Sequence, residues 1–391
     1  MDKGKIILSA LGIAVVLLAA LLLWNHLFVN RRVLWTYQAA IQDGIAKFDC
    51  FPDGGVVLTT SYDIRRLDAS GRLKWKSATF SSLNADSRGH IYADPYRDRS
   101  IFVSHNGCVL AFDDTGKHLW TNGKSRDDPA GRVIDLAEDG TVAVAFSRSG
   151  MKYIDINGAW LKTIPLEGYH GYYPASIGPT GNIYYVYGES MVFHNKKPVY
   201  PDSKKKFRRA LDMHGNELWK HQGNYMGAYD RFHPLDADTV LIGHRLQGLV
   251  AYGADGKELW QADCRTDYGD NISIDPDRIY VSGLNGLRAF SHAGKQLWEL
   301  KVPFWTFTPQ FNGQDVVYCY EEYLPPEIVA KGDKASEEEW KSSTYNLLAV
   351  DAANGELLWK EEWKETPGKL RVRPDGSVVI KDGRRLRCLQ P

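Results

Sequence analysis

Short runs of alternating apolar and polar residues, separated by Gly, Asp or Pro, occupy nearly the whole chain after residue 32. Such runs are typical of half-buried β-strands joined by tight turns. One phrase recurs: an apolar residue and Asp, a turn with Gly, then Leu-Trp, as in "LDMHGNELW" ending at Trp219. Each copy predicts a β-hairpin, because Asp at the first position and Gly at the fourth suit a type I turn.

The phrase returns about every forty residues, the length of a propeller blade. Full copies end at Trp75, Trp120, Trp219, Trp260, Trp298 and Trp359; a degenerate copy, "IDINGAWLK", ends at Lys162, and a half copy, "RRVLW", ends at Trp35. A second set of turn signals falls between the copies, at 51–55, 86–89, 137–140, 178–181, 235–238, 275–278, 311–315 and 373–376. Two hairpins make four strands per unit, here named A to D in chain order.

The two chain ends complete the count. The C-terminus, "LRVRPDGSVVIKDGRRLRCLQP", supplies strands A to C but lacks the Trp strand, and "RRVLWTYQ" near the N-terminus is a lone Trp strand. Pairing of 33–38 with 383–389 would close the ring and remove the open sheet edges. We therefore predict an all-β, eight-bladed β-propeller over 31–391, closed by an N-terminal strand at about 32–39. The alternative, two unrelated β domains, is disfavoured because the repeat spans 33–390 without a linker.

The repeated tryptophans are predicted to join the blades, because a blade cannot bury its faces alone. An indole at the same point on each outer strand would bury most of roughly 200 Å² against the neighbouring blade. Ligand binding is the alternative, but a single ligand would need one or two tryptophans. The predicted blade-docking residues are Trp35, Trp75, Trp120, Trp219, Trp260, Trp298 and Trp359.

The phrase, in the style A-x-D-x-x-x-G-x-x-x-W, resembles the tryptophan-docking motif of the quinoprotein family, the eight-bladed propellers of the pyrroloquinoline-quinone type. The resemblance covers nearly all of 33–390. The family includes quinone-dependent alcohol dehydrogenases and non-catalytic relatives, notably the lipoprotein scaffold of the outer-membrane β-barrel assembly machinery. The enzymes would imply two adjacent cysteines, a calcium site of Glu, Asn and Asp, and an Asp base. No two cysteines are adjacent here, so the chain resembles the non-catalytic branch.

Composition limits the remaining chemistry. Lys plus Arg equals Asp plus Glu at 48 each, which gives no electrostatic case for nucleic acid. The five cysteines are never in C-x-x-C spacing, so neither a zinc site nor a disulfide framework is indicated. Histidines in metal-ligand spacing and the common catalytic motifs are also missing. We predict no catalytic residue, no cofactor and no metal.

Residues 6–24 carry no charge, and as a helix they would span about 28 Å, enough to cross a bilayer core. We predict a short tail and an uncleaved transmembrane signal anchor over 1–30; a cleaved signal peptide is the alternative. Lys3 and Lys5 before the run and Arg31 and Arg32 after it leave the orientation open. Resemblance to exported relatives implies that the propeller lies on the extracytoplasmic side.

Two B–C connections are long. One, 194–209, is basic, and the other, 321–341, is acidic. They are either solvated surface loops or docking sites. Both would leave the same face, here the insertion face, while the A–B and C–D turns form the opposite, short-turn face, where the chain enters. Candidate partner-binding residues in these segments and in the links between blades are Lys196, Lys197, Lys204, Lys205, Lys206, Arg208, Arg209, Tyr229, Arg231, Tyr268, Trp305, Glu337, Glu338 and Glu339.

The sequence thus predicts a membrane-anchored, single-pass β-propeller that is a protein-interaction scaffold of the bacterial cell envelope, with other envelope proteins as partners. Two alternatives stay open: a quinone- or small-ligand-dependent oxidoreductase that uses the central funnel, and a cell-wall or carbohydrate-binding module that uses exposed aromatic residues.

Overall fold

The computed structural model describes residues 32–390 except 42, 84–88, 105–107, 123–131, 147–149, 167–174, 189–191, 195–196, 200–205, 224–230, 245–247, 265–270, 326, 329–343 and 364–369. The anchor predicted at 6–24 lies outside this part of the chain. Within it, no helix combines the length and the apolar character that a membrane span requires.

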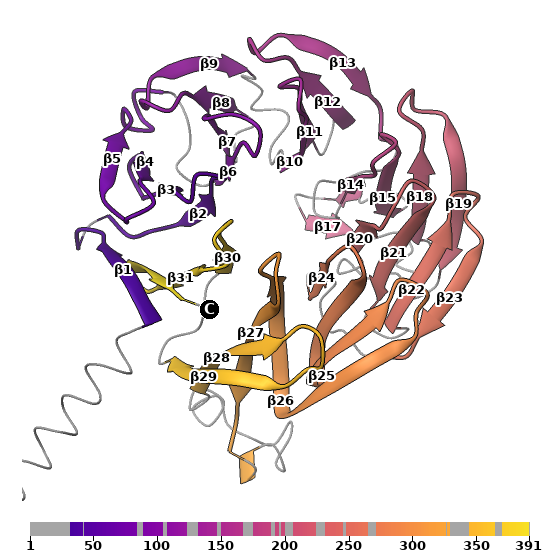
Figure 1. The fold of residues 1–391 in the computed structure, drawn as a ribbon. Helices are drawn as coiled ribbons and strands as arrows, with labels where there is room; N and C mark the ends of the chain where they lie inside the picture. The colour runs from indigo at the N-terminus through magenta and orange to yellow at the C-terminus, as the bar shows by residue number, and fades with distance from the viewer. Residues whose placement is uncertain are drawn as a thin grey trace, which may run out of the picture.

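Six four-stranded sheets and one six-stranded sheet are arranged in a ring, as Figure 1 shows, with the first strand of each blade nearest the centre. Blade 1 holds β2 (Lys47–Cys50), β3 (Val56–Thr59), β4 (Ile64–Leu67) and β5 (Leu73–Lys76); blade 2 holds β6 (Gly89–Ala93), β7 (Ser100–Ser104), β8 (Val109–Phe112) and β9 (His118–Asn122). Blade 3 holds β10 (Arg132–Leu136), β11 (Val142–Phe146), β12 (Gly150–Ile154) and β13 (Trp160–Ile164). Blade 4 holds β14 (Ala175–Ile177), β15 (Ile183–Gly188), β18 (Lys206–Leu211) and β19 (Glu217–Gly223), and blade 5 holds β20 (Arg231–Pro234), β21 (Thr239–His244), β22 (Gly248–Gly253) and β23 (Glu258–Ala262).

Blades 6 and 7 share the six-stranded sheet, which runs β24 (Ile272–Ile274), β25 (Arg278–Ser291), β26 (Gln296–Phe311), β27 (Val316–Tyr323), β28 (Thr344–Asp351) and β29 (Leu357–Trp363). The first half of β25 pairs with β24 and its second half with β26. In the same way, β26 pairs first with β25 and then with β27. Each of these long strands therefore supplies two blade strands, and the sheet makes two of the eight blades.

The eighth blade is built from both chain ends, as predicted. Strand β1 (Val33–Gln38) pairs antiparallel with β32 (Arg385–Leu389), and the sheet continues through β31 (Val378–Asp382) to β30 (Leu370–Val372). Trp35 lies opposite Cys388 in this register. In Figure 1 the indigo β1 lies beside the yellow C-terminal strands. The N-terminal strand thus closes the ring.

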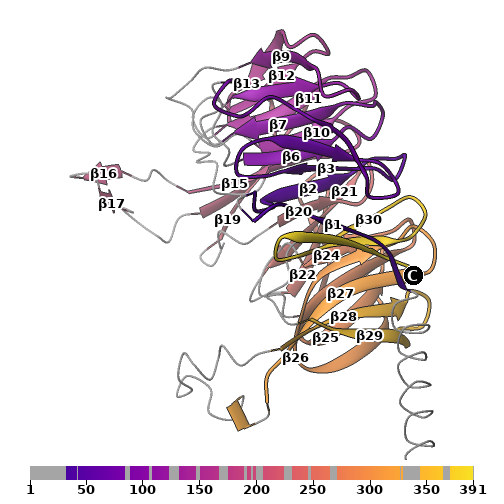
Figure 2. The same ribbon diagram turned by 90° about the vertical axis from the view of Figure 1, so that its left-hand side faces the viewer.

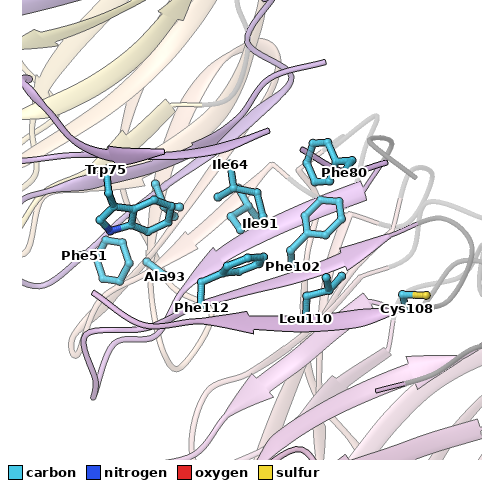
Figure 3. Packing of buried hydrophobic residues seen from close by; sticks show 11 residues of the cluster. Phe51, Ile64, Trp75, Phe80, Ile91, Ala93, Phe102, Cys108, Leu110 and Phe112 are labelled. Atoms are coloured by element: carbon cyan, nitrogen blue, oxygen red, sulfur yellow. The ribbon is translucent and has the colours of Figure 1, made fainter. Parts of the chain in front are cut away.

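The hydrophobic core is divided among the joints between blades. At the joint between blades 1 and 2, Phe51, Ile64 and Trp75 pack with Phe102 and Phe112, as Figure 3 shows. The second strands are buried along their whole length in β3, β7 and β11. A strand buried on both faces favours a continuous apolar run over alternation, which explains sequences such as "VAVAF".

One predicted turn is misplaced. The A–B turn of blade 2 was expected at 86–89, but Gly89 begins β6, and the turn lies at 94–99. The Asp94 carboxylate accepts the backbone N–H of Tyr96 and pairs with the Arg99 guanidinium. Because this ion pair supports a turn longer than the usual four residues, the Asp-x-x-Gly pattern did not identify it.

The basic insertion also differs from the prediction. Strands β16 (Val192–His194) and β17 (Lys197–Val199) form a separate two-stranded sheet, which Figure 2 shows projecting away from the disc. Strand β18 then starts at Lys206 and pairs with β15. The insertion therefore ends before Lys206, and not at Arg209 as expected.

Candidate functional site

Tryptophan and glycine meet at six of the joints between consecutive blades. A Cβ atom added to Gly71 would lie 2.5 Å from Cδ2 of Trp35, and one added to Gly116 would lie 2.7 Å from Cδ2 of Trp75. The same contact joins Trp120 to Gly158, Trp219 to Gly256, Trp260 to Gly294 and Trp298 to Gly355. Each glycine belongs to the C–D turn of the following blade, so the Leu-Trp phrase of one blade packs on the Asp-x-x-Gly phrase of the next.

The glycines are needed for a second reason, because they occupy the left-handed region of backbone conformation. Gly71 has φ of 80° and Gly116 has φ of 84°, a region that residues with a Cβ rarely adopt. The turn ahead of Gly71 is held by the Asp68 carboxylate, whose Oδ1 accepts the N–H groups of Ser70 and Arg72. The hydrogen bonds from Ser70 are the main reason that the pKa of Asp68 lies below its usual value.

The joint between blades 3 and 4 uses Lys162 where the other blades have tryptophan. The Lys162 ammonium donates to the carbonyl oxygen of Met213 at 3.1 Å. This carbonyl lies two residues before Gly215, and the indole N–H of Trp120 donates to the corresponding oxygen of Ile156 at 2.8 Å. Lys162 therefore keeps the polar contact of a docking tryptophan but omits the flat apolar ring.

The joint between blades 7 and 8 is also different, because the chain ends replace the C–D turn of blade 8. The guanidinium carbon of Arg32 lies 4.5 Å from the centroid of the Trp359 ring. The Gln390 N–H donates to the Arg32 carbonyl, which ties the two ends together. A cation over the ring thus takes the place of the glycine contact.

Buried arginines also cross the joints on the short-turn face. Arg66 is fully buried, with its guanidinium carbon 3.7 Å from the centroid of the Phe51 ring, and it binds Asp53 in its own blade and Asp98 in blade 2. Arg99 donates to the Gly140 carbonyl of blade 3 at 2.7 Å. Neither arginine was predicted from the sequence, because nothing in the local pattern distinguishes a buried arginine from an exposed one.

The two faces of the disc carry different segments. Val33 pairs with Leu389 at the start of β1, which places the entering chain on the short-turn face. The connections from β15 to β18 and from β27 to β28 leave the opposite face, on which Figure 2 also shows the β16–β17 hairpin. The strand ends that the two insertions connect therefore lie on the face away from Val33.

The structure places the predicted partner-binding residues unevenly. Arg208 is buried and donates to the hydroxyl of Tyr252 in blade 5, and Arg209 pairs with Glu217 at 2.6 Å. Both, like Lys206, belong to β18 rather than to a loop, and the buried Arg208 is no longer a candidate for docking.

Three of the remaining candidates lie in strands, and the others lie outside the described residues. Lys197 lies in β17, Arg231 is the first residue of β20, and Trp305 lies in β26, where its backbone pairs with Leu284 and Glu322. Those outside the described residues are Lys196, Lys204, Lys205, Tyr229, Tyr268, Glu337, Glu338 and Glu339.

Comparison with known proteins agrees with the geometry of the blades. A family model described as "Outer membrane protein assembly factor BamB" matches residues 208–321. The crystal structure of BamB from Moraxella catarrhalis has a TM-score of 0.56 at 14% identity, over 92% of this chain and 99% of that one. The computationally designed Ika8 protein has a TM-score of 0.65 at 13% identity, over 92% and 100%. No curated protein sequence matches the chain.

This chain is a quinoprotein-like propeller that resembles BamB. The matched residues begin in β18 and end in β27, so they include blades 5 and 6 completely. The closing blade and the projecting β16–β17 hairpin lie outside the match. The likeness to the two solved structures, at these identities, extends to the fold alone.

The first strands of blades 8, 1 and 2 contact one another near the centre of the ring. Arg371 of β30 binds Asp49 of β2 at 2.9 Å, and the second Asp49 oxygen accepts the Ala93 N–H. The five cysteines are free and none neighbours another in sequence, so the adjacent-cysteine disulfide cannot form. Among the described residues, no group of three or more His, Cys, Asp and Glu is placed to hold a metal ion.

Proposed function

We propose that this protein is a membrane-anchored, extracytoplasmic scaffold of the bacterial cell envelope, with partner proteins docking on the insertion face. The observation that carries the proposal is that two features lie on opposite faces of the disc. The chain enters beside Leu389 on the short-turn face, and both insertions leave the other face. The apolar run at 6–24 is separated from β1 by the eight residues 25–32. An anchor there would hold the short-turn face toward the membrane and present the insertion face to partners.

The chemistry of the insertions supports protein recognition. Lys196, Lys197, Lys204 and Lys205 make one insertion basic, and Glu337, Glu338 and Glu339 make the other acidic. Charges of both signs on one face favour selective and fast association with a partner of complementary charge. In the sequence, Tyr229, Arg231, Tyr268 and Trp305 fall in or beside links between blades, which we expect to border this face. Tyr, Trp and Arg are the residues that dominate interface energies.

The resemblance to BamB supports the cellular setting. The matching family is described as an outer membrane protein assembly factor, a protein whose work is carried out with other envelope proteins. By this analogy we expect protein partners in the cell envelope, and components of an outer-membrane assembly machinery are the first to test. A shared fold does not establish a shared binding site. The decisive experiment therefore changes the insertions themselves.

The experiment replaces 189–205 by a short Gly-Ser link. Gly188 pairs with Lys206, so this replacement spares β15 and β18. Crosslinking and mass spectrometry of intact membranes should then show loss of the partners, with the thermal unfolding temperature preserved. A matched variant keeps the length and changes Lys196, Lys197, Lys204 and Lys205 to Ser; it should weaken the same crosslinks. An unchanged set of partners in both variants would overturn the docking proposal.

A further inference from the structure

The outer strand of blade 3 has one more exposed position than the outer strands of blades 2 and 5. In β13 the residues Trp160, Leu161, Lys162 and Thr163 are all exposed, and only Ile164 is buried. The outer strands β9 and β23 each have a half-buried tryptophan at the position of Lys162. The difference follows from the missing indole ring, since Lys162 keeps the contact with Met213 but covers little apolar surface.

One face of this edge combines a cation with aromatic rings. The Lys152 ammonium lies 4.9 Å from the ring centroid of Phe146 and 4.8 Å from that of Trp160. The Trp160 ring packs edge-on against Phe146 and is still 42% exposed. A large aromatic side chain that is exposed at this edge offers apolar area to a bound segment.

The other face repeats the combination. Tyr153 follows Lys152 in β12, so its side chain points to the opposite face of the sheet. The Lys162 ammonium lies 4.4 Å from the centroid of the Tyr153 ring. Met213, whose carbonyl Lys162 binds, is 45% exposed. In the described part of the chain, no carboxylate forms an ion pair with Lys162.

Strand β13 also ends its sheet, because the strand order is β10-β11-β12-β13. One side of its backbone is therefore free to pair with an added strand. A second copy of β13 is a poor occupant, because its sequence, Trp-Leu-Lys-Thr-Ile, offers no acidic side chain to Lys162. A segment with acidic and apolar side chains on each face would match both faces of the edge.

We propose that β13 is a docking edge, at which an extended segment of a partner protein adds as a fifth strand of blade 3. The segment carries paired acidic and paired apolar residues, so that each of its faces presents both kinds. A carboxylate of the segment lies beside Lys162, and its apolar side chains cover Trp160 and Met213. This edge lies on the rim of the disc and is separate from the insertion face, so the inference goes beyond the proposed function.

The probe is a fluorescein-labelled twelve-residue peptide of repeating Glu-Glu-Val-Val, titrated against the full chain in detergent micelles and followed by fluorescence anisotropy. We expect Lys162→Glu and Leu161→Asp each to weaken binding about tenfold or more. The matched control is Leu297→Asp in blade 6, where the leucine before the tryptophan is 44% exposed; it should bind like the unchanged protein. The proposal would be overturned if Lys162→Glu bound the peptide as tightly as the unchanged protein. It would also be overturned if Leu297→Asp weakened binding as much as Leu161→Asp.

Further probes distinguish strand addition at β13 from binding elsewhere on the protein and from binding to a lipid surface. A Lys-Lys-Val-Val peptide, and an acidic peptide N-methylated at alternate residues, should both fail to bind; binding of either would overturn the added-strand geometry. The variant lacking 189–205 should bind the acidic peptide unchanged, which distinguishes this edge from the insertion face. Phosphatidylglycerol vesicles are the test of a lipid occupant: vesicle binding lost in Lys162→Glu, without peptide binding, would refute the proposal.

Lys162→Trp gives an independent test, because it restores the repeat. A ring at this position would cover the Met213 side of the edge, so we expect peptide binding to fall without a lower unfolding temperature. A folded Lys162→Trp protein that binds the peptide normally would contradict the proposed site.

Discussion

The Arg32 guanidinium lies 4.5 Å over the Trp359 ring and so closes the ring of joints between blades. Six other joints pair a tryptophan with a glycine of the next blade, but blade 8 has no C–D turn, because the chain begins and ends there. A side chain from the N-terminal end takes over the contact. The stability of the closed ring should therefore depend on residues at the very start of the propeller, next to the proposed anchor.

Gly116→Ala and Gly313→Ala form a matched pair that measures tryptophan docking. Both glycines have positive φ, 84° and 82°, but only a Cβ at Gly116 would overlap a side chain, that of Trp75, at 2.7 Å. We expect Gly313→Ala to lower the free energy of unfolding by about 1 kcal/mol through backbone strain. Gly116→Ala should cost roughly 1–3 kcal/mol more because Trp75 must move. Urea unfolding measures the difference, and equal losses would argue against docking.

Arg32→Ala should weaken the closure of the ring. A cation over a largely buried ring contributes about 1 kcal/mol, and Trp359 is only 9% exposed. The expected result is a loss of that size in the free energy of unfolding. Arg72→Ala serves as the control, since Arg72 is exposed on a turn and its removal should change stability little. Identical unfolding midpoints for Arg32→Ala and the unchanged protein would contradict the closing role of Arg32.

Asp63 should make stability depend on acid pH. Burial raises the pKa of this carboxyl, but hydrogen bonds from Arg65, Lys76 and Thr60 outweigh burial, so the pKa lies below its usual value. Arg65 also binds the hydroxyl of Tyr37 in the closing strand. The pKa of Asp63 is lower in the folded state, so its contribution to the free energy of unfolding is fully present above the unfolded-state pKa of about 3.9. This contribution is lost as the pH falls through the folded-state pKa.

Asp63→Asn should therefore flatten the acid part of the stability profile, and Tyr37→Phe should lower stability by about 1 kcal/mol without changing that profile. The free energy of unfolding of each variant is measured between about pH 2 and pH 6, roughly two pH units on either side of the usual carboxyl pKa. If the stability of Asp63→Asn fell with decreasing pH as in the unchanged protein, another group would be responsible for the acid dependence.

Cys264 should resist thiol reagents in the folded protein. Burial raises its pKa to about 11, and the side chain is 1% exposed. Near pH 8 the thiolate, which is the reactive form, is therefore scarce and shielded. We expect a reaction with a disulfide reagent that is far slower than in the urea-unfolded protein, followed by mass spectrometry of the labelled peptide. Rapid labelling of Cys264 in the native state would contradict this burial.

Regular elements were predicted well, and departures from the repeat were not. The turn phrase, the eight blades and the pairing of 33–38 with the C-terminal strand were all derived from periodicity, and the structure has them. The run "KFRR", residues 206–209, was assigned to an insertion because basic residues resemble a solvated loop. It lies in β18, where Arg208 is buried against Tyr252 of the next blade. Only a neighbouring blade could supply that partner, and no local pattern contains it.

The sequence by itself determined the blade, its number of copies and the closure of the ring, because strand period, turn chemistry and repeat length are properties of neighbouring residues. The tertiary structure decided what meets across the joints. It pairs Arg32 with Trp359, directs Lys162 to Met213, and leaves β13 exposed on both faces. These contacts join residues of different blades, so their geometry exists only after the whole ring has formed.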